Sequence, residues 1–300
     1  MKKLRVGTRR SELALTQTAI VINEMKKYRP DMEFEVKKIT TQGDKLLQEP
    51  LSQIGGKGLF VKELEEALLE GSIDMAVHSM KDMPYEIPEK LCVMPVLKRE
   101  EARDVLISRE GNKFMDLKAG AKIGTSSLRR ISQLKALRPD IEIVQLRGNI
   151  QTRIRKISDE NLDGIVLAAA GLKRLGLEEK ITQYFPVDLI VPAACQGTLA
   201  VEIREGFEEE FMSMYPMLLD VKTLFETIAE RKILKRLGGN CKIPIGIHAQ
   251  YLKEDNIDKI KIKVAYQKNT ELMKVEEKGI VDDIDKMADT IMEKLEEKDN

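Results

Sequence analysis

The stretch LFVKELEEALLEGSIDMAVHSM, residues 59–80, decides the fold class of this chain. In its first half the apolar residues Phe60, Leu64 and Leu68 recur at the spacing of one helix face, and Gly71 follows where such a helix would end. In its second half the apolar run IDMAVHSM has the length of a buried strand. A helix that leads through a short turn into a buried strand is typical of α/β proteins.

The same alternation continues on both sides of this stretch, from residue 3 to about residue 200. Further strand-like segments are LRVGT, FEVKKIT, CVMPVLK, DVLISRE, AKIGTS, IEIVQLRG and LDGIVLAAA, and several of them lead into helical patterns. Residues 100–195 repeat the pattern of the first hundred without obvious sequence identity, which predicts two α/β lobes of similar size around a cleft. Ligands in such folds gather at the carboxyl ends of strands and the amino ends of helices.

The last third of the chain has a different pattern. A helical segment, VKTLFETIAERKILKRL, is followed by two strand-like segments, KIPIGIHAQYL and KIKIKVAYQ, and by a charged helix from about residue 281. This order predicts a small α+β domain. The expected domains are therefore residues 1–98 with 196–217, residues 99–195, and residues 218–300.

Composition argues against several classes of function. The 50 basic residues balance the 50 acidic ones, and the chain has seven Phe, six Tyr and no Trp, so no nucleic-acid surface is expected. No stretch approaches the ~18 apolar residues of a membrane span, and the N-terminus lacks the apolar core of a signal peptide, so we expect a cytoplasmic protein. The three cysteines, Cys92, Cys195 and Cys241, are odd in number and widely spaced, which argues against disulfides and against a zinc site. No metal is expected.

The segment RRISQLKALRPDIEIVQLRGNIQTRIR, residues 129–155, carries six arginines and only two acids. Arg129 and Arg130 follow the hydroxyl-rich GTSS, which suits a helix N-cap, and Arg147 ends a strand. Solvated basic faces are common, but arginines at helix starts and strand ends favour an anion site. Because arginine binds carboxylates bidentately, a ligand with several carboxylates fits this segment better than a neutral one, and phosphate remains an alternative.

Asp82 and Cys241 are the other candidates for chemistry. Asp82 lies in VHSMKDMP at the end of an apolar strand, where a carboxylate is either a solvated turn residue or a group that stabilises a cation and moves a proton. Cys241 lies just after two glycines in KRLGGNCKIPIG, in a turn that leaves a helix, which is an unusual place for a structural thiol. The only histidines, His78 and His248, offer Cys241 no convincing partner, so a thiol-protease mechanism is disfavoured.

A long loop, residues 41–59, precedes the opening stretch. Loops of this length in compact domains are usually lids, binding loops or disordered segments, and we favour a lid. Its GGKG motif lacks the glycine spacing and the Ser/Thr of a phosphate-binding Walker A loop.

Seven motifs, in order from residue 7 to residue 246, resemble the hydroxymethylbilane synthase family, also called the porphobilinogen deaminases. They are GTRRSELALTQ, GGKGLFVKELEEALLEGSIDMAVHSMKDMP, GTSSLRRISQL, LRGNIQTRIRK, AAAGLKRLGL, PAACQGTLAVE and GGNCKIPIG. Members of this family join four porphobilinogen molecules head to tail and release ammonia. The resemblance implies two lobes like type II periplasmic binding proteins with an active-site cleft between them. It also implies a third domain whose cysteine, here Cys241, holds a dipyrromethane cofactor through a thioether bond.

The resemblance further implies roles for individual residues. Asp82 matches the catalytic aspartate, which stabilises positively charged pyrrole intermediates and assists proton transfer as ammonia leaves. Besides Cys241, the implied cofactor-binding residues are Lys81, Ser79, Thr125, Ser127, Arg129, Arg130, Arg147 and Arg153. The implied substrate-binding residues are Arg9, Ser11, Gln17, Arg147, Arg153 and Arg174, and the implied lid residues are Gly55, Gly56, Lys57 and Gly58. A monomer is expected. Cys195 departs from the family, which commonly has glycine there.

Two interpretations of other classes remain open at this point. A non-catalytic, two-lobed anion-binding module would explain the arginines and the lid, but it would not explain Cys241. A thiol acyltransferase would use Cys241, but it lacks a plausible histidine partner. Incubation with porphobilinogen separates the three, because only a synthase consumes it and yields an open-chain tetrapyrrole.

Overall fold

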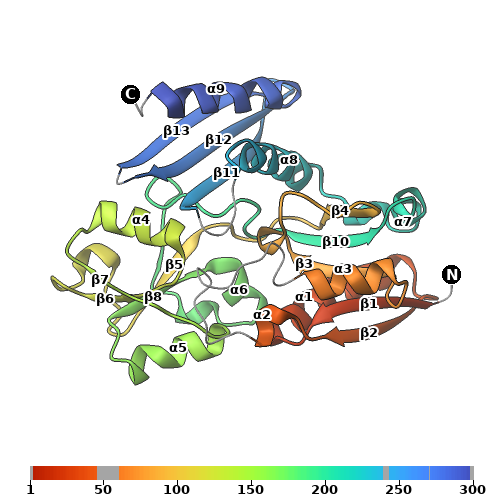
Figure 1. The fold of residues 1–300 in the computed structure, drawn as a ribbon, viewed down its shortest axis with the longest axis horizontal. Coiled ribbons are helices and arrows are strands. Elements are labelled where there is room, and N and C mark those ends of the chain that lie inside the picture. Colours follow the sequence, from red (N-terminus) through yellow and green to blue (C-terminus); the bar gives the residue numbers. More distant parts are fainter. Residues whose placement is uncertain (1–2, 46–60, 239–242, 270, 298–300) are drawn as a thin grey trace. The chain divides into compact units, whose positions relative to one another are not determined.

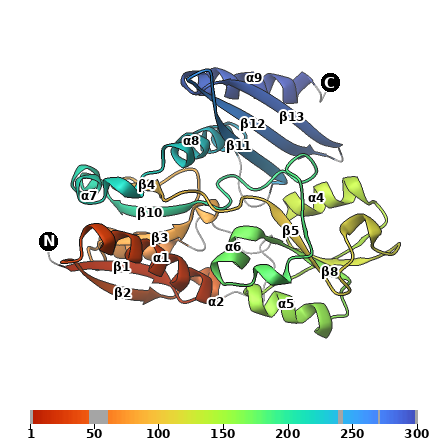
Figure 2. The same cartoon turned by 180° about the vertical axis from the view of Figure 1, so that it is seen from behind.

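The computed structural model describes residues 3–45, 61–238, 243–269 and 271–297 of the chain. The chain divides into two units, Met1–Glu100 with Gly197–Leu224 and Glu101–Gln196 with Phe225–Asn300. Figure 1 shows their helices and strands coloured along the sequence, and Figure 2 shows the same elements from behind. The three-domain division expected from the sequence stays a prediction.

The first unit is built around a five-stranded sheet in the order β2-β1-β3-β10-β4. Strand β1 is parallel to β2 and β3, whereas β10 is antiparallel to β3 and β4. Its elements are β1 (Lys3–Arg9), α1 (Glu12–Tyr28), β2 (Glu33–Ile39), α2 (Gln42–Lys45), α3 (Lys62–Leu69), β3 (Met75–Ser79), η1 (Met80–Asp82), β4 (Leu91–Val96), β10 (Leu199–Arg204), α7 (Glu208–Met214), η4 (Pro216–Leu218) and the first residues of α8 (Val221–Arg236).

Both faces of this sheet are covered, and the alternation of side chains along β1 shows how. Leu4 and Val6 point into the larger core, which also contains Val21 and Met25 of α1. Gly7, which follows Val6, faces α3, because a Cβ at Gly7 would lie 2.4 Å from Ile73 in the core beneath that helix. Burial on both faces explains why β3, MAVHS, reads as an apolar run rather than an alternating one.

The second unit contains a five-stranded sheet in the order β7-β6-β8-β5-β9. Strand β6 is parallel to β7 and β8, whereas β5 is antiparallel to β8 and β9. The elements of this part are β5 (Asp104–Ser108), η2 (Phe114–Asp116), β6 (Lys122–Gly124), α4 (Leu128–Leu137), β7 (Glu142–Val144), α5 (Ile150–Asp159), β8 (Gly164–Ala168), α6 (Ala169–Arg174), η3 (Glu178–Lys180) and β9 (Gln183–Tyr184).

The two five-stranded sheets have one topology. Each contains three parallel strands, and the one that comes first in the chain lies between the second and the third. The third strand pairs with an antiparallel strand, and this strand pairs with a strand at the edge of the sheet. In each sheet the antiparallel strand is distant in the sequence from the third parallel strand beside it. Strand β10 follows the return of the chain from the second unit, and β5 opens the second unit before β6. The repeat expected from the sequence is therefore confirmed, together with the expected class of two α/β lobes and a small α+β part.

The rest of the second unit is an antiparallel sheet with two helices. Strands β11 (Ile245–Glu254), β12 (Ile257–Lys268) and β13 (Glu271–Ile280) lie in that order, followed by η5 (Val281–Asp283) and α9 (Ile284–Glu297). Both views show α9 along one face of this sheet (Figures 1 and 2). The edge strand β11 donates the amides of Ala249 and Tyr251 to Glu230 and Glu226 of α8, so its open edge is partly covered.

Residues near the two crossovers have backbone conformations that the sequence analysis did not anticipate. Leu97 and Cys195 have positive φ angles of 64° and 59°. The position of Cys195 therefore suits glycine, which matches the family's common residue there. Gly197 has φ +95°, and a Cβ at this position would lie 2.2 Å from the carbonyl oxygen of Glu100. Only glycine allows this close approach without a shift of the backbone.

Candidate functional site

The site residues expected from the sequence follow the carboxyl ends of parallel strands in each unit. In the first unit, Arg9 ends β1, and Ser79 to Asp82 end β3 and form η1. In the second unit, Thr125 follows β6, Arg147 follows β7, and the helix α6 with Arg174 follows β8. Parallel strands present their carboxyl ends at one edge of a sheet, which is where ligands bind in α/β folds.

Asp82 is the last residue of η1, which continues directly from β3. The amide of Met80 donates to the carbonyl of Thr198 at 3.0 Å, so the β3–β10 pairing fixes the start of this turn. The Asp82 side chain is exposed and makes no hydrogen bond or ion pair with any described residue. A carboxylate without a protein partner at a strand end is available to a ligand.

Two other expected residues of the first unit meet directly. Gln17 is buried, and its Nε2 donates to Oγ of Ser79 at 2.7 Å. Ser11 occupies the N-cap of α1, where its Oγ accepts from the amide of Ala14 at 3.3 Å. Gln17 thus orients the hydroxyl of Ser79 beside η1.

Arg9 has a partner that the sequence analysis missed. Its Nε and Nη2 donate to the carboxylate of Asp44 on α2, and Thr41 donates its hydroxyl to the same carboxylate at 2.9 Å. Burial alone would raise the pKa of Asp44, but the hydrogen bonds and charge of Arg9 outweigh it, so this pKa lies below its ordinary value. The motif TQGD after β2, which contains Asp44, was the sequence signal that could have indicated this pair. Arg9 of β1 lies 35 residues earlier in the chain, so no local pattern connects the two residues.

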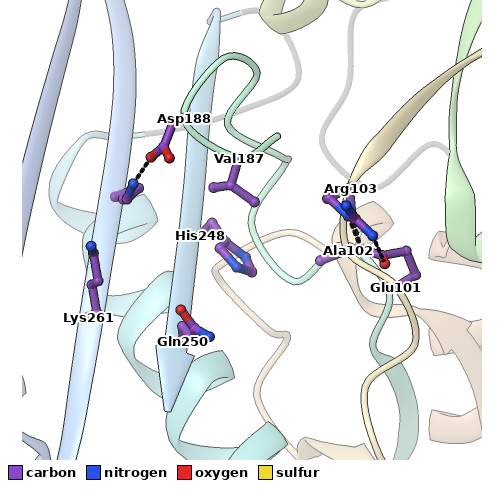
Figure 3. A pocket seen from close by; sticks show the side chains of 9 residues that line it. Glu101, Ala102, Arg103, Val187, Asp188, His248, Gln250 and Lys261 are labelled. Atoms are coloured by element: carbon purple, nitrogen blue, oxygen red, sulfur yellow. Dashed lines mark hydrogen bonds and ion pairs between the residues drawn. The ribbon is translucent and has the colours of Figure 1, made fainter. Parts of the chain in front are cut away.

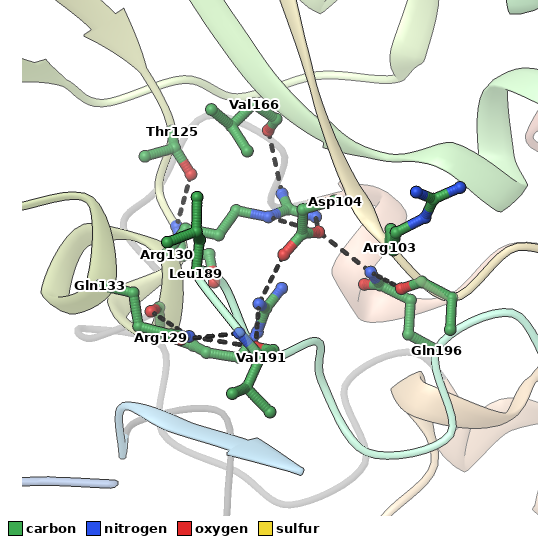
Figure 4. Close-up of polar contacts among 12 residues, drawn as sticks. Arg103, Asp104, Thr125, Arg129, Arg130, Gln133, Val166, Leu189, Val191 and Gln196 are labelled. Atoms are coloured by element: carbon green, nitrogen blue, oxygen red, sulfur yellow. Dashed lines mark hydrogen bonds and ion pairs between the residues drawn. The ribbon is translucent and has the colours of Figure 1, made fainter. Parts of the chain in front are cut away.

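Arg129 and Arg130 are buried around a second acid that the sequence analysis missed, Asp104 of β5 (Figure 4). Arg129 Nη1 lies 2.6 Å from Asp104 Oδ2 and 2.8 Å from the carbonyl oxygen of Val191. Arg130 donates through Nε and Nη2 to Asp104 Oδ1 and through Nη1 to the carbonyl of Val166. Burial alone would raise the pKa of Asp104, but the two guanidinium charges hold it well below its ordinary value.

This arrangement leaves a net positive charge with donors to spare. Asp104 is fully buried and also accepts from Nε2 of Gln196 at 3.0 Å. Two guanidinium charges face one carboxylate, and Nε and Nη2 of Arg129 make no hydrogen bond within the described part of the chain. The excess positive charge therefore favours a further carboxylate as a ligand of this cluster, and part of each arginine's binding capacity is already used by Asp104.

The remaining expected residues of the second unit lie on nearby loops and helix ends. Arg147 is half-buried and makes no hydrogen bond or ion pair to the residues that the structure describes, so its fork is available to an anion. Arg153 donates through Nε to the carbonyl of Gly148 at 2.8 Å. Thr125 accepts from the amide of Ser127, the N-cap residue of α4, at 3.3 Å. Arginine forks and N-cap groups together suit a ligand with several carboxylates.

Several expected residues lie outside the described residues: Cys241, Gly55, Gly56, Lys57 and Gly58. Immediately before Cys241's segment, α8 ends at Arg236, and Gly238 has φ +58°, the left-handed conformation in which glycine commonly ends a helix. The roles expected for Cys241 and for the lid stay predictions.

The clearest cavity in the second unit does not contain any of the expected site residues (Figure 3). It has a volume of about 360 Å³ and is lined by Glu101, Ala102, Arg103, Val187, Asp188, His248, Gln250, Lys261 and Lys263. Its charges are largely paired, since Arg103 binds Glu101 at 2.6 Å and Lys263 binds Asp188. The chemistry is therefore better placed at the strand ends than in this cavity.

Among the residues that the structure describes, no helix is long and apolar enough to cross a membrane. Within the same residues, no group of three or more His, Cys, Asp or Glu side chains is arranged to hold a metal ion.

Comparison with known proteins gives one consistent result. A family model described as porphobilinogen deaminase, dipyromethane cofactor binding domain, matches residues 4–212, and the porphobilinogen deaminase C-terminal domain matches residues 224–297. A porphobilinogen deaminase from Syntrophomonas wolfei is 50% identical over 250 residues, which cover 83% of this chain and 81% of the relative. Another, from Geobacter sulfurreducens, is 46% identical over 98% of this chain and 92% of the relative.

Similarity to solved structures is weaker. The periplasmic aliphatic sulphonate binding protein SsuA from Escherichia coli shares 16% identity with a TM-score of 0.42, over 79% of this chain and 71% of that chain. The two family models and the curated relatives, in contrast, follow this sequence through nearly its whole length. The chain belongs to the porphobilinogen deaminase family.

Proposed function

We propose that the protein joins four porphobilinogen molecules head to tail on a dipyrromethane held by Cys241 and then releases hydroxymethylbilane by hydrolysis. Family membership makes it a transferase of tetrapyrrole biosynthesis, which disfavours the alternative of a non-catalytic anion-binding module. The observation that carries the proposal is the match of both family models. The matched ranges, residues 4–212 and 224–297, include Asp82 and Cys241 respectively. A monomeric state and a cytoplasmic location remain predictions.

The proposed anchor is Cys241. A thiolate is a strong soft nucleophile, and the left-handed Gly238 turns the chain out of α8 just before it. When bound, the dipyrromethane supplies the free pyrrole carbon to which the first substrate is joined. Cys195 is buried and the pKa of Cys92 is raised to about 11, chiefly by burial, so neither of these thiols competes well for the role.

The proposed carboxylate clamp is the arginine set of the second unit. Each porphobilinogen carries an acetate and a propionate, so each added unit brings two carboxylates to be neutralised. Arg147 and the unused edge of Arg129 offer guanidinium donors of the right geometry. Arg130 contributes mainly by helping to keep the cluster around Asp104 positively charged. Arg9, Ser11, Gln17, Arg153 and Arg174 are proposed to bind substrate, and Ser79, Lys81, Thr125 and Ser127 to bind cofactor.

Asp82 is the proposed catalytic residue. When a substrate loses ammonia, its amino group leaves with the bonding electrons and takes a proton, so the pyrrole ring and its methylene carbon become positively charged. The exposed carboxylate of Asp82, unpaired within the described residues, stabilises such a charge by Coulomb attraction. It is also available to accept the proton that is released when the new carbon–carbon bond forms.

Incubation of the purified protein with porphobilinogen tests this function. We expect release of ammonia together with an open-chain tetrapyrrole that cyclises spontaneously to a uroporphyrinogen. Cys241→Ser is the matched control, because it removes the proposed anchor and should abolish both products. Binding of porphobilinogen without ammonia release by the wild-type protein would contradict the proposal.

A further inference from the structure

A small polar cluster lies within the apolar core of the first unit, directly behind η1. It consists of His78 on β3, Glu202 on β10 and Glu65 on α3, which are 5%, 0% and 8% exposed. Nε2 of His78 and Oε2 of Glu202 are 3.0 Å apart. The mechanism above uses none of these three groups, although buried charges are costly unless they are paired.

Strand register explains why the cluster forms. In the antiparallel β3–β10 pair, His78 lies opposite Ala200, and Ala76 lies opposite Glu202. His78 and Glu202 are therefore diagonal neighbours on the same face of the sheet. Leu64 and Leu68 of α3 share an apolar cluster with Ala76 on this face, so α3 covers it and brings Glu65 to the pair.

The two carboxylates cannot both be charged there at low cost. Oε1 of Glu65 and Oε1 of Glu202 are buried, and neither has a hydrogen-bond partner among the described residues. Burial and the negative charge of Glu202 raise the pKa of Glu65 to about 7. One proton on the pair removes the repulsion between the two carboxylates and leaves the contact between Glu202 and His78 in place.

Among the described residues, the other titratable side chains on the elements packed against α3 are paired, neutral or exposed. They therefore do not neutralise Glu65 and Glu202 in place of the proton. Arg5 of β1 and Arg204 of β10 are both paired with Asp74, at 2.7 and 3.4 Å. The thiol of Cys92 on β4 has a pKa raised to about 11 and is neutral, and Glu66 on α3 is exposed. The remaining charged side chains of α3 and β1 have partners as well: Lys3 with Glu35, Arg9 with Asp44, Lys62 with Glu66, and Glu63 with the amide of Gln42.

We propose that Glu65 and Glu202 hold one proton between them, and that Glu202 and His78 act as positioning residues for the turn that carries Lys81 and Asp82. Two contacts hold β3 and the start of that turn against β10 and the residue before it: His78 Nε2 with Glu202 Oε2, and the amide of Met80, which donates to the carbonyl of Thr198. The positioning part rests on the proposed function of Asp82, whereas the shared proton does not.

The sign of the pH dependence follows from the raised pKa. The folded state binds the proton of Glu65 more tightly than the unfolded chain, whose Glu pKa is about 4.3. The stabilisation is complete below that value and is lost as the pH rises through about 7. Between about pH 5 and about pH 8 this single group should raise the equilibrium constant for unfolding by roughly 50- to 100-fold.

Urea unfolding of the wild type and of Glu65→Gln over this pH range tests the shared proton. Glutamine keeps the shape of a protonated carboxyl and cannot ionise, so the variant should lack the roughly 50- to 100-fold change and be the more stable protein near pH 8. Glu66→Gln, on the exposed face of the same helix, is the matched control and should keep the wild-type slope. Equal slopes in the wild type and Glu65→Gln would overturn the shared proton.

Turnover with porphobilinogen tests the positioning part. We expect kcat of the wild type to fall on the alkaline side and Glu65→Gln to move that limb to higher pH, with KM unchanged in both. Glu202→Gln, which keeps an oxygen acceptor for His78, should retain most of kcat, whereas Glu202→Leu should lose kcat at an unchanged KM. An alkaline limb that stays in place, or equal kcat in the two Glu202 variants, would overturn the positioning role. If the proposed catalytic role of Asp82 were wrong, Asp82→Asn would turn over porphobilinogen normally, and this result is independent of the Glu202 variants.

Discussion

At the scale of single residues, the candidate site combines partnered and unpartnered charges. Asp82 and Arg147 have no partner among the residues described, whereas Arg9, Arg129 and Arg130 are tied to carboxylates of the protein itself. A tied arginine is held in one rotamer before the ligand arrives, so less entropy is lost on binding. The tied arginines therefore also have structural roles, and their variants need stability measurements beside activity measurements.

Asp82→Asn should separate chemistry from folding. The change removes one preorganised charge, which typically costs about 10²–10³ in rate, or about 2.7–4 kcal/mol of transition-state stabilisation. The melting temperature should not change, because the side chain is exposed and makes no contact with a described charged group. Steady-state kinetics should show a low kcat at nearly unchanged KM, since arginines hold the substrate carboxylates. Near-normal turnover would make Asp82 a solvated turn residue.

Asp104→Asn should destabilise the protein by about 3–5 kcal/mol, because it leaves two buried guanidinium groups without their counter-charge. Urea unfolding measures this loss. Asp31→Asn is a suitable control, since its pair with Arg29 is exposed and should be worth at most about 1 kcal/mol. Equal stabilities of the two variants would mean that the Asp104 cluster does not hold the second unit together.

At the scale of elements, much of the architecture was predictable from local patterns. The opening stretch becomes α3 and β3, and Gly71 ends the helix with φ +69° as expected. Strand β13 was missed because its sequence, ELMKVEEKGI, is rich in charge and has only one clean apolar face. The acids Asp44 and Asp104 were missed because their contacts lie 35 and 25 residues away, and no local pattern reports such a distance.

Gly197→Ala tests the close approach at the second crossover. The added Cβ would lie 2.2 Å from the carbonyl oxygen of Glu100, in addition to the strain of φ +95°. We expect a loss of more than about 2 kcal/mol in the free energy of unfolding. Gly176→Ala is the matched control, because it has φ +66° with no atom near the new Cβ and should cost only about 1–2 kcal/mol. If Gly197→Ala lowered the free energy of unfolding less than Gly176→Ala does, the carbonyl of Glu100 would move away from the new Cβ at little cost, which would contradict this prediction.

At the scale of the whole molecule, one buried carboxyl group in each unit should contribute oppositely to the pH dependence of stability. The pKa of Asp104 in the second unit is lowered, so its stabilisation is present above about pH 4 and is lost as the pH falls below that value. The pKa of Glu65 in the first unit is raised to about 7, so its stabilisation is lost as the pH rises. Hydrogen exchange measured on peptides of each unit should show that Asp104→Asn weakens the acid dependence of opening in the second unit, and that Glu65→Gln weakens the alkaline dependence in the first. Unchanged pH profiles in these two variants would contradict the assignments.

The function itself needed more than composition and spacing. The balance of 50 basic and 50 acidic residues conceals the local excess of arginine in residues 129–155, and only the order of seven motifs connected that excess with Cys241. Topology then explains the arrangement within each unit, because both sheets present the expected residues after parallel strands. The bond between Cys241 and a cofactor is a covalent modification, and neither periodicity nor packing can predict it.

The intact mass of the purified protein tests the central claim most directly. We expect the wild type to weigh more than its 300-residue sequence by one dipyrromethane attached as a thioether. Cys241→Ser should lose this increment completely, whereas Cys92→Ser and Cys195→Ser should keep it. A wild-type protein from porphobilinogen-replete cells at the bare sequence mass, or an increment that persists in Cys241→Ser, would contradict the assignment of Cys241 as the cofactor anchor.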